Sequence, residues 1–471
     1  MSSRNGLGRV QMQRVALVAP KDAFRDVLVE VADEGTVDLD EVASAGRAGS
    51  APTVVSTDAP TIARERPDKD ELARRGARSL LAGEAELERR ESAALPHGRV
   101  AALLGWVPDE ALPPLRQRIE PLGGAAVVLP RPLGVDPPTL LAPRSRSAPF
   151  RVLVDTYGTV RYADIDPTPF AAFAFALMFG MMFGDAGRGL LLVAIGLLAR
   201  TGKGFLGRFR AAWALLVAAG VSATAFGVAF GELFGPTHVV PAVWLVPLDD
   251  PVRLLVAGVI LGGGLLGISQ VIGTVNRWRE GGARFALYEP SGVAGLCSYV
   301  GLGLVVAGLY FDVRPVALAG GVLVAIGIVL VFSGRFVAAG GRGAGVAQAT
   351  VEAFDGLVRL GSNVVSFARL AAFGLTAAAI GSVVWDGTTA LWQPNLAAVG
   401  AVVLFVVGNV VAFALEALVV GVQALRLEYY ELFSRMLGDE GRPFRPWHVA
   451  LVAPDGSLRA DELKETSCVS G

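Results

Sequence analysis

The sequence predicts a mainly α-helical, polytopic membrane bundle with a small α/β domain at its N-terminal end. Of its 471 residues 53% are hydrophobic and only 18% charged, which is too apolar for an ordinary soluble protein. Residues 1–150 are polar and punctuated by proline, whereas residues 164–437 consist mostly of long apolar runs. These two unlike parts indicate a small domain outside the membrane and a larger one within it.

The N-terminal part shows the short, alternating patterns of strands and helices. Strands are expected at 10–19, 100–107 and 125–129, and helices at 23–34, 70–92 and 112–121. Residues 45–68 are rich in Ala, Ser, Thr and Pro, which is typical of a flexible linker. The amphipathic segments can bury a modest core, so residues 1–150 are predicted to form a small cytoplasmic α/β domain.

The second part contains the windows that could cross a bilayer. Charge-free windows cover 211–231, 254–276, 290–311, 315–334, 370–385 and 387–415. A helix needs ~20 apolar residues to cross ~30 Å of hydrocarbon. Two shorter segments, 168–183 and 189–199, form a predicted hairpin, which makes about eight transmembrane helices within 164–437. No proline interrupts the last two, so these are expected to be long and tilted.

Basic residues alternate between successive loops. Arginines follow the second, fourth, sixth and eighth segments, as at Arg208, Arg284, Arg335 and Arg442, and the opposite loops hold few. The positive-inside rule then puts both termini in the cytoplasm of a cell-membrane protein. Residues 438–471 are accordingly expected to form a cytoplasmic tail, and the start of the chain lacks the pattern of a signal peptide.

Several classes of function are not indicated. The net charge of −1, without a basic cluster, predicts no nucleic-acid partner. The two cysteines and three histidines are scattered, so no disulfide framework, metal site or other cofactor is expected. The phosphate-binding pattern G-x-x-x-x-G-K-[ST] does not occur in the sequence. We therefore expect no catalytic residues here, and any nucleotide chemistry would belong to a partner chain.

Arg369 lies inside an apolar run and gives the first indication of function. A guanidinium keeps its proton in proteins, and placing it in a membrane helix costs ~2.5–3.5 kcal/mol on insertion scales. A fixed cation in a bilayer is suited to controlling the movement of another ion. Polar residues share its helical face or lie near it: Asp355, Ser362, Asn363, Ser366 and Thr376.

The final apolar segment carries a second polar line. Asn409, Glu416 and Gln423 recur every seven residues, and Arg426 follows at the next turn. From Asn409 to Gln423 this line spans ~21 Å of helix. Ionisable residues arranged in this way within a membrane mark ion or proton paths. The alternative is that Arg369 and Glu416 form a buried ion pair that only holds two helices together.

Three separated segments resemble the membrane subunit of rotary V-type and A-type ATPases, called subunit a or subunit I. They are DIDPTPFAAFAFALMFGMMFGDAGRG at 164–189, SNVVSFARL at 362–370 and ALEALVVGVQALRLEYYELFSRMLGDEGRPFRPW at 414–447. The first is similar to the family's first membrane hairpin, the second to the motif of its essential arginine, and the third to its final helix. The opening segment, 10–39, is similar to the family's N-terminal lobe.

The resemblance implies a stator that couples proton or Na⁺ translocation to rotation. Arg369 would face the carboxylates of a proteolipid ring, assisted by Arg426. Glu416 would belong to an external half-channel and Asp355 to a cytoplasmic one, with Ser366 and Asn363 as polar lining. The implied partners are the proteolipid ring, peripheral stalk subunits, the ATPase catalytic subunits linked to the central stalk, and the lipid bilayer. ATP synthesis and ATP hydrolysis are both compatible with this role.

The sequence departs from the family in two notable places. Only residues of about 40–98 are available for the family's long helical hairpin, so that hairpin is expected to be shortened. Arg188 stands where the family usually has an aromatic residue or histidine. Two other functions stay open: a secondary transporter that uses Arg369 to bind an anionic substrate, and a scaffold that assembles a complex without carrying ions.

Overall fold

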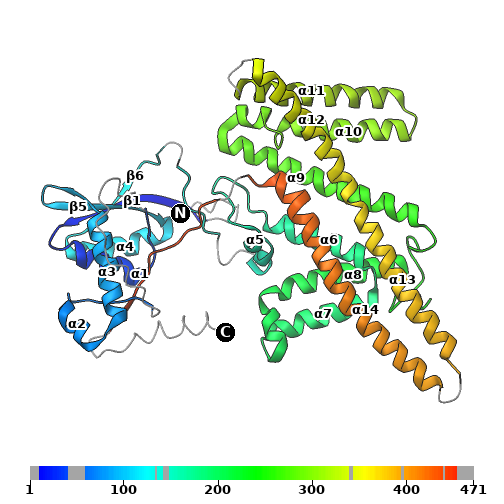
Figure 1. Ribbon diagram of the computed structural model, residues 1–471, viewed down its shortest axis with the longest axis horizontal. Coiled ribbons are helices and arrows are strands. Elements are labelled where there is room, and N and C mark those ends of the chain that lie inside the picture. Colours follow the sequence, from blue (N-terminus) through cyan, green and yellow to red (C-terminus); the bar gives the residue numbers. More distant parts are fainter. Residues whose placement is uncertain are drawn as a thin grey trace. The chain divides into compact units, whose positions relative to one another are not determined.

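The computed structural model describes residues 10–40, 59–132, 135–141, 148–338, 343–393, 397–438 and 441–452. Two compact units make up the chain (Figure 1). The first unit combines Met1–Ala142 with Gly441–Gly471, and the second is Pro143–Glu440. Most of the linker predicted at 45–68 and most of the tail predicted at 438–471 lie outside the described residues.

The first unit is an antiparallel sheet with helices packed against it. The strand order is β2-β5-β1-β6, and β4 also pairs with β5. The strands are β1 (Met12–Pro20), β2 (Asp38–Leu39), β4 (Leu95–His97), β5 (Val100–Pro108) and β6 (Ala125–Leu129). The helices are α1 (Phe24–Glu34), α2 (Lys69–Arg75), α3 (Arg78–Ala93) and α4 (Leu112–Ile119), with short 3₁₀ turns η1 (Asp109–Ala111) and η2 (Glu120–Leu122). This agrees with the α/β pattern expected from the sequence.

Two features of this unit differ from expectation. The single helix predicted at 70–92 is two helices, because Gly76 adopts a left-handed conformation (φ 68°) that ends α2. Strand β3 (Thr61–Ala63) lies in the predicted linker and pairs in parallel with β7 (Ala450–Val452) from the C-terminal segment. Trp447 and Leu451 are buried in the same apolar core as Val15 and Leu17 of β1, so the C-terminal segment completes this unit.

The second unit consists of helices. They are α5 (Arg151–Tyr157), α6 (Thr168–Phe183), α7 (Ala186–Arg200), α8 (Trp213–Phe230), α9 (Pro251–Tyr288), α10 (Val293–Tyr310), α11 (Arg314–Ala338), α12 (Gly343–Ser366), α13 (Ala368–Leu391), α14 (Ala397–Leu427) and α15 (Ser434–Met436). Two 3₁₀ segments, η3 (Ala148–Phe150) and η4 (Gly204–Ala212), and a π-helix, η5 (Glu428–Phe433), complete it.

Within the described residues, six helical segments are long and apolar enough to cross a membrane. They are Gly204–Phe230, Pro251–Arg284, Ala286–Tyr310, Arg314–Val337, Gly345–Leu391 and Ala397–Met436. The expected fold class, a polytopic helical bundle, is therefore confirmed. The expected count of about eight is not reached, because α6 and α7 have only 16 and 15 residues.

Small residues allow the hairpin α6–α7 to pack closely against α8. A Cβ atom on Gly227 would lie 2.0 Å from the backbone nitrogen of Ala186, and one on Gly189 would lie 2.6 Å from that of Thr224. Helices at such distances require glycine, so Gly227 and Gly189 serve helix packing. The hairpin also contacts α13 and α14, which run side by side (Figure 1).

The helical segment that carries Arg369 tightens at Phe367, between α12 and α13. Phe367 separates α12 from α13, and its N–H donates to Val364 O while Leu370 N–H donates to Phe367 O. These bonds span three residues instead of four and therefore tighten the chain locally. The Phe367 ring is fully buried against Gly262 of α9, where a Cβ atom would come within 2.0 Å of it. At this point between α12 and α13 the Phe367 ring therefore packs directly against the backbone of α9.

Candidate functional site

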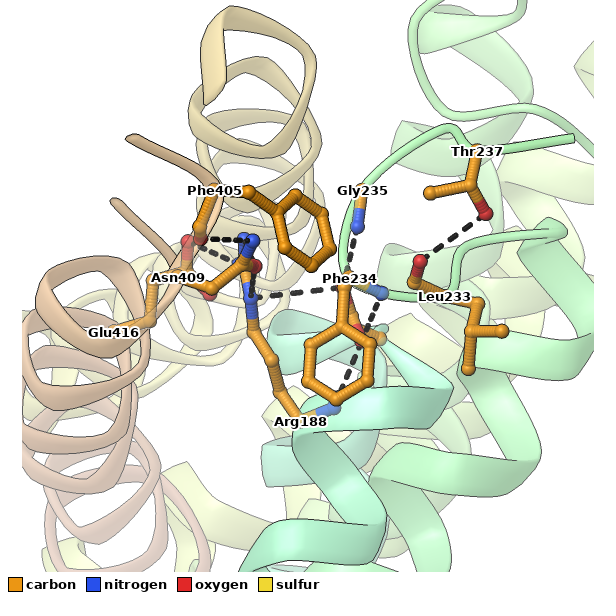
Figure 2. Close-up of polar contacts among 9 residues, drawn as sticks. Arg188, Leu233, Phe234, Gly235, Thr237, Phe405, Asn409 and Glu416 are labelled. Atoms are coloured by element: carbon orange, nitrogen blue, oxygen red, sulfur yellow. Dashed lines mark hydrogen bonds and ion pairs between the residues drawn. The ribbon is translucent and has the colours of Figure 1, made fainter. Parts of the chain in front are cut away.

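Arg188 is at the centre of the most buried polar site in the second unit. Gly184, in a left-handed conformation (φ 49°), ends α6, and Asp185 caps the first turn of α7 by accepting the Arg188 N–H at 2.9 Å. The tight turn projects Arg188 from the start of α7 toward α14 (Figure 2). Only 1% of the Arg188 side chain is exposed, so its charge depends entirely on protein partners.

Glu416 and Asn409 of α14 supply those partners (Figure 2). The Nη1 atom of Arg188 donates to both Glu416 carboxylate oxygens, at 2.8 and 2.7 Å. Its Nε and Nη2 atoms donate to Asn409 Oδ1, at 3.2 and 3.1 Å. The Asn409 side-chain nitrogen in turn donates to Phe405 O at 2.9 Å, which fixes the amide orientation. Two turns of α14 therefore hold one guanidinium through charge-assisted hydrogen bonds.

The segment after α8 closes the other side of this site. The N–H groups of Phe234 and Gly235 donate to the Asp185 carboxylate at 3.0 and 2.9 Å. Asp185 Oδ2 also lies 3.6 Å from Arg188 Nε. Asp185 is 1% exposed and holds together the hairpin, the loop and the arginine. Glu232 in the same loop is 6% exposed and interacts electrostatically with Asp185, Arg188 and Glu416.

The alternative of a buried ion pair between Arg369 and Glu416 does not hold, since Glu416 pairs with Arg188. Arg369 is only half-buried, and its Nη1 atom is buried without a hydrogen-bond partner among the described residues. The same holds for the side-chain oxygen of Gln423 on α14. Arg426 is exposed on that helix. The polar line of α14 thus divides: Asn409 and Glu416 face the hairpin, whereas Gln423 and Arg426 do not join that site.

The predicted site residues on α12 lie nearer the surface. Asp355 is exposed and pairs with Arg359 one turn later, with 2.7 Å between Asp355 Oδ2 and Arg359 Nε. Ser366 is half-buried at the last position of α12. The side-chain nitrogen of Asn363 donates to Glu431 Oε2 at 3.1 Å in the amide orientation that its neighbours favour. Asn363 therefore links α12 to the π-helix that follows α14.

That π-helix carries two buried acids that the sequence pattern did not single out. Glu428 is fully buried, and neither of its carboxylate oxygens has a hydrogen-bond partner among the described residues. Glu431 is 8% exposed and contacts Asn363. π-Helices occur often at functional sites because they displace side chains from the regular helical register. Both acids lie within the segment 414–447, which the sequence already indicated as important. What the sequence could not show is that their side chains are buried.

Beyond the ends of the membrane spans, Asp164 lies where the chain enters α6. Burial raises the pKa of its carboxyl group to about 6, although Arg277 and Arg161 act in the opposite direction. Nearby, Asn276 of α9 accepts the Ile165 N–H at 3.0 Å and donates to Met436 O at 3.0 Å. These bonds join the start of α6 to the end of the last helix. In the part of the chain that the structure describes, no group of acids, histidines or cysteines is arranged to hold a metal ion.

Known proteins that match this chain include subunits of V-type ATPases and of A-type ATP synthases. The model of the V-type ATPase 116 kDa subunit family matches residues 98–204. A-type ATP synthase subunit I of Pyrococcus horikoshii is 29% identical over 363 residues, which cover 73% of this chain and 53% of that protein. The subunit I proteins of Thermococcus kodakarensis and Archaeoglobus fulgidus are 28% and 29% identical, over 76% and 73% of this chain and 56% and 58% of their own lengths.

The chain spans about half the length of the curated relatives it matches. The matched regions cover most of this chain and include the hairpin that carries Asp185 and Arg188. With six apolar helical segments of sufficient length, it is a multi-pass membrane protein. Residues 98–204 thus match the V-type ATPase 116 kDa subunit family, and most of the chain is similar to A-type ATP synthase subunit I proteins.

Proposed function

We propose that this chain is the stator membrane subunit of a rotary V/A-type ATPase or ATP synthase and couples proton or Na⁺ translocation to rotation. Its relatives are named as A-type ATP synthase subunit I, which supports a place in such a complex. In this proposal Arg369 faces the proteolipid ring between two half-channels. ATP hydrolysis or synthesis occurs on partner chains, and peripheral stalk subunits hold this one still against the rotor.

The observation that carries the proposal is the state of Arg369. Its Nη1 atom is buried without a partner in the described part of the chain, although a buried donor normally has one. Gln423 Oε1 is likewise unsatisfied. An arriving ring carboxylate would accept the free Nη1 donor of Arg369 and would be favoured in its ionised form beside the fixed charge. Among the residues that the structure describes, Arg369 therefore lacks an acceptor that a carboxylate of the rotor would supply.

The other predicted residues take roles consistent with their positions. Asp355, with Ser366 and Asn363 near the end of α12, would line the cytoplasmic half-channel, and Arg426 would assist Arg369 from α14. Glu416 and Asn409 would belong to the external half-channel together with the Arg188 site. Both termini would be cytoplasmic, in accordance with the arginine-rich loops on that side.

The test is Arg369→Lys in the assembled complex, reconstituted into vesicles. Lysine keeps a positive charge but lacks the planar set of five donors and can lose its proton when buried. We expect coupled ion pumping to be lost, with assembly retained. The matched control is Arg253→Lys, because Arg253 is 75% exposed in its ion pair with Asp250. Wild-type pumping by Arg369→Lys would exclude the assigned role.

A scaffold that assembles the complex without carrying ions is the second candidate. It is favoured by the Arg188–Glu416 ion pair, which occupies a carboxylate that an external half-channel would otherwise use. Co-purification separates both candidates from a secondary transporter, which would not bring down a proteolipid ring and nucleotide-binding subunits. Ion flux through the purified complex then distinguishes the translocating subunit from the scaffold.

A further inference from the structure

The Arg188 site has an excess of acidic groups. Asp185, Glu232 and Glu416 surround one guanidinium, and these three acids are 1%, 6% and 5% exposed, respectively. If all three were ionised, three negative charges against one positive would leave a net charge of −2. A charge of that kind, closed off from water, is strongly unfavourable, and a buried acid becomes neutral by taking up a proton instead.

Hydrogen bonding shows which acid is the least suited to being ionised. Asp185 accepts three backbone N–H groups, from Arg188, Phe234 and Gly235. Glu416 accepts two hydrogen bonds from Arg188. The Glu232 carboxyl group accepts none from the described residues, although its backbone is fixed: Ala186 N–H donates to Glu232 O at 2.9 Å. Donors stabilise a carboxylate, and among the described residues of this site Glu232 is the acid whose carboxyl group lacks them.

We propose that Glu232 is a proton-binding residue, which takes up and releases one proton beside the Arg188–Glu416 ion pair. The proton, and not a metal cation, is the ligand, because within the described residues the three acids do not form a metal-binding arrangement. Its position on the transport route, as the loading group of the external half-channel, rests on the proposed function; the proton binding itself does not.

The surroundings of Glu232 set its titration range. It lies in the segment between the span that ends at Phe230 and the one that begins at Pro251. Burial raises the pKa of the Glu232 carboxyl group to about 8; Asp185 and Glu416 also raise it, and Arg188 lowers it. The group therefore carries its proton below about pH 8 and loses it above, so small changes in its surroundings would switch it near neutral pH.

Infrared difference spectroscopy on the full-length protein in detergent tests the proposal. Spectra recorded on either side of pH 8 should show the C=O stretch of a protonated carboxyl group at the lower pH only. Glu232→Gln should remove the component of this difference band that titrates near pH 8. The control Asp249→Asn, which removes an exposed acid from the same loop, should retain it. Should Glu232→Gln fail to fold, Glu232→Asp should shift the midpoint of the band instead.

Three results would overturn the proposal: a band near pH 8 that is unchanged in Glu232→Gln, no such band in the wild type, or a band that changes when Na⁺ is added at constant pH. These spectra need neither a rotor nor ATPase partners, so they are independent of the Arg369→Lys pumping assay. Loss of the band in Glu232→Gln together with wild-type pumping by Arg369→Lys would refute the proposed function and leave the proton site standing. The reverse pattern would refute only the proton site.

Discussion

Replacing Arg188 by methionine tests whether the buried ion pair stabilises the hairpin against α14. Methionine keeps much of the side-chain volume but removes four donor contacts, two to Glu416 and two to Asn409. Glu416 is only 5% exposed, so water cannot replace the guanidinium without opening the site. Removing one partner of a buried pair typically costs ~3–5 kcal/mol. The lost hydrogen bonds are already included in that figure and are not added to it.

The assay is denaturant unfolding of the full-length protein in detergent, followed by tryptophan fluorescence. We expect Arg188→Met to lower the free energy of unfolding by ~3–5 kcal/mol. The double variant Arg188→Met/Glu416→Gln should recover most of this loss, because the uncompensated carboxylate is then gone. Arg253→Met, at a 75% exposed position, serves as the control and should change the free energy by less than ~0.5 kcal/mol.

Two results would refute the reasoning. One is a loss of less than ~1 kcal/mol in Arg188→Met, which would mean that the pair is solvated or is not formed. The other is a double variant no more stable than the single one, which would show that the stranded Glu416 charge is not the source of the loss. Either outcome would also remove the structural account of why arginine occupies position 188.

Two further predictions concern Asp164, before α6, and Gly262 of α9. Asp164→Asn should raise the melting temperature above pH 6 and leave it little changed near pH 4. Burial raises the pKa of Asp164 to about 6 in the folded state, above its value of 3.8 in the unfolded chain. The wild-type protein therefore loses up to ~3 kcal/mol of folding free energy as the pH rises between those values. An equal effect of the variant at both pH values would contradict this. Gly262→Ala should displace the Phe367 ring, since a Cβ atom would lie 2.0 Å from it, and should reduce ion flux through the complex by disturbing the break before Arg369. Gly264→Ala, whose Cβ atom would meet nothing within 4 Å, should have no effect on flux, and equal flux in both variants would separate the break from function.

Local sequence patterns predicted helices and strands well where neighbouring residues alone determine the ends of an element. The predicted strand 125–129 and helix 168–183 match β6 and α6 residue for residue, because hydrophobic periodicity and flanking glycine or proline mark their ends. Strand β3 was missed because its partner, β7, lies almost 400 residues later in the chain, and no local signal connects them. The break at Phe367 was also missed, since it involves packing against Gly262 on another helix.

The candidate site shows the same division. The seven-residue spacing placed Asn409 and Glu416 on one face, and both are buried side by side in the structure. Their partner could not be read from that spacing, because it depends on which helix packs against α14. The hairpin, not α13, supplies the cation, through Arg188. The signal that could have found it was the arginine itself, in an apolar hairpin beside Asp185.

The pairing of β3 with β7 has a consequence for biosynthesis. Strand β7, with Trp447 and Leu451, completes the apolar core of the N-terminal unit, yet the ribosome makes these residues after every membrane helix. The nascent N-terminal unit must therefore wait, with part of its core uncovered, while the hydrophobic segments enter the bilayer. Premature termination anywhere in the membrane part would leave this domain without β7 and with part of its apolar core exposed to water.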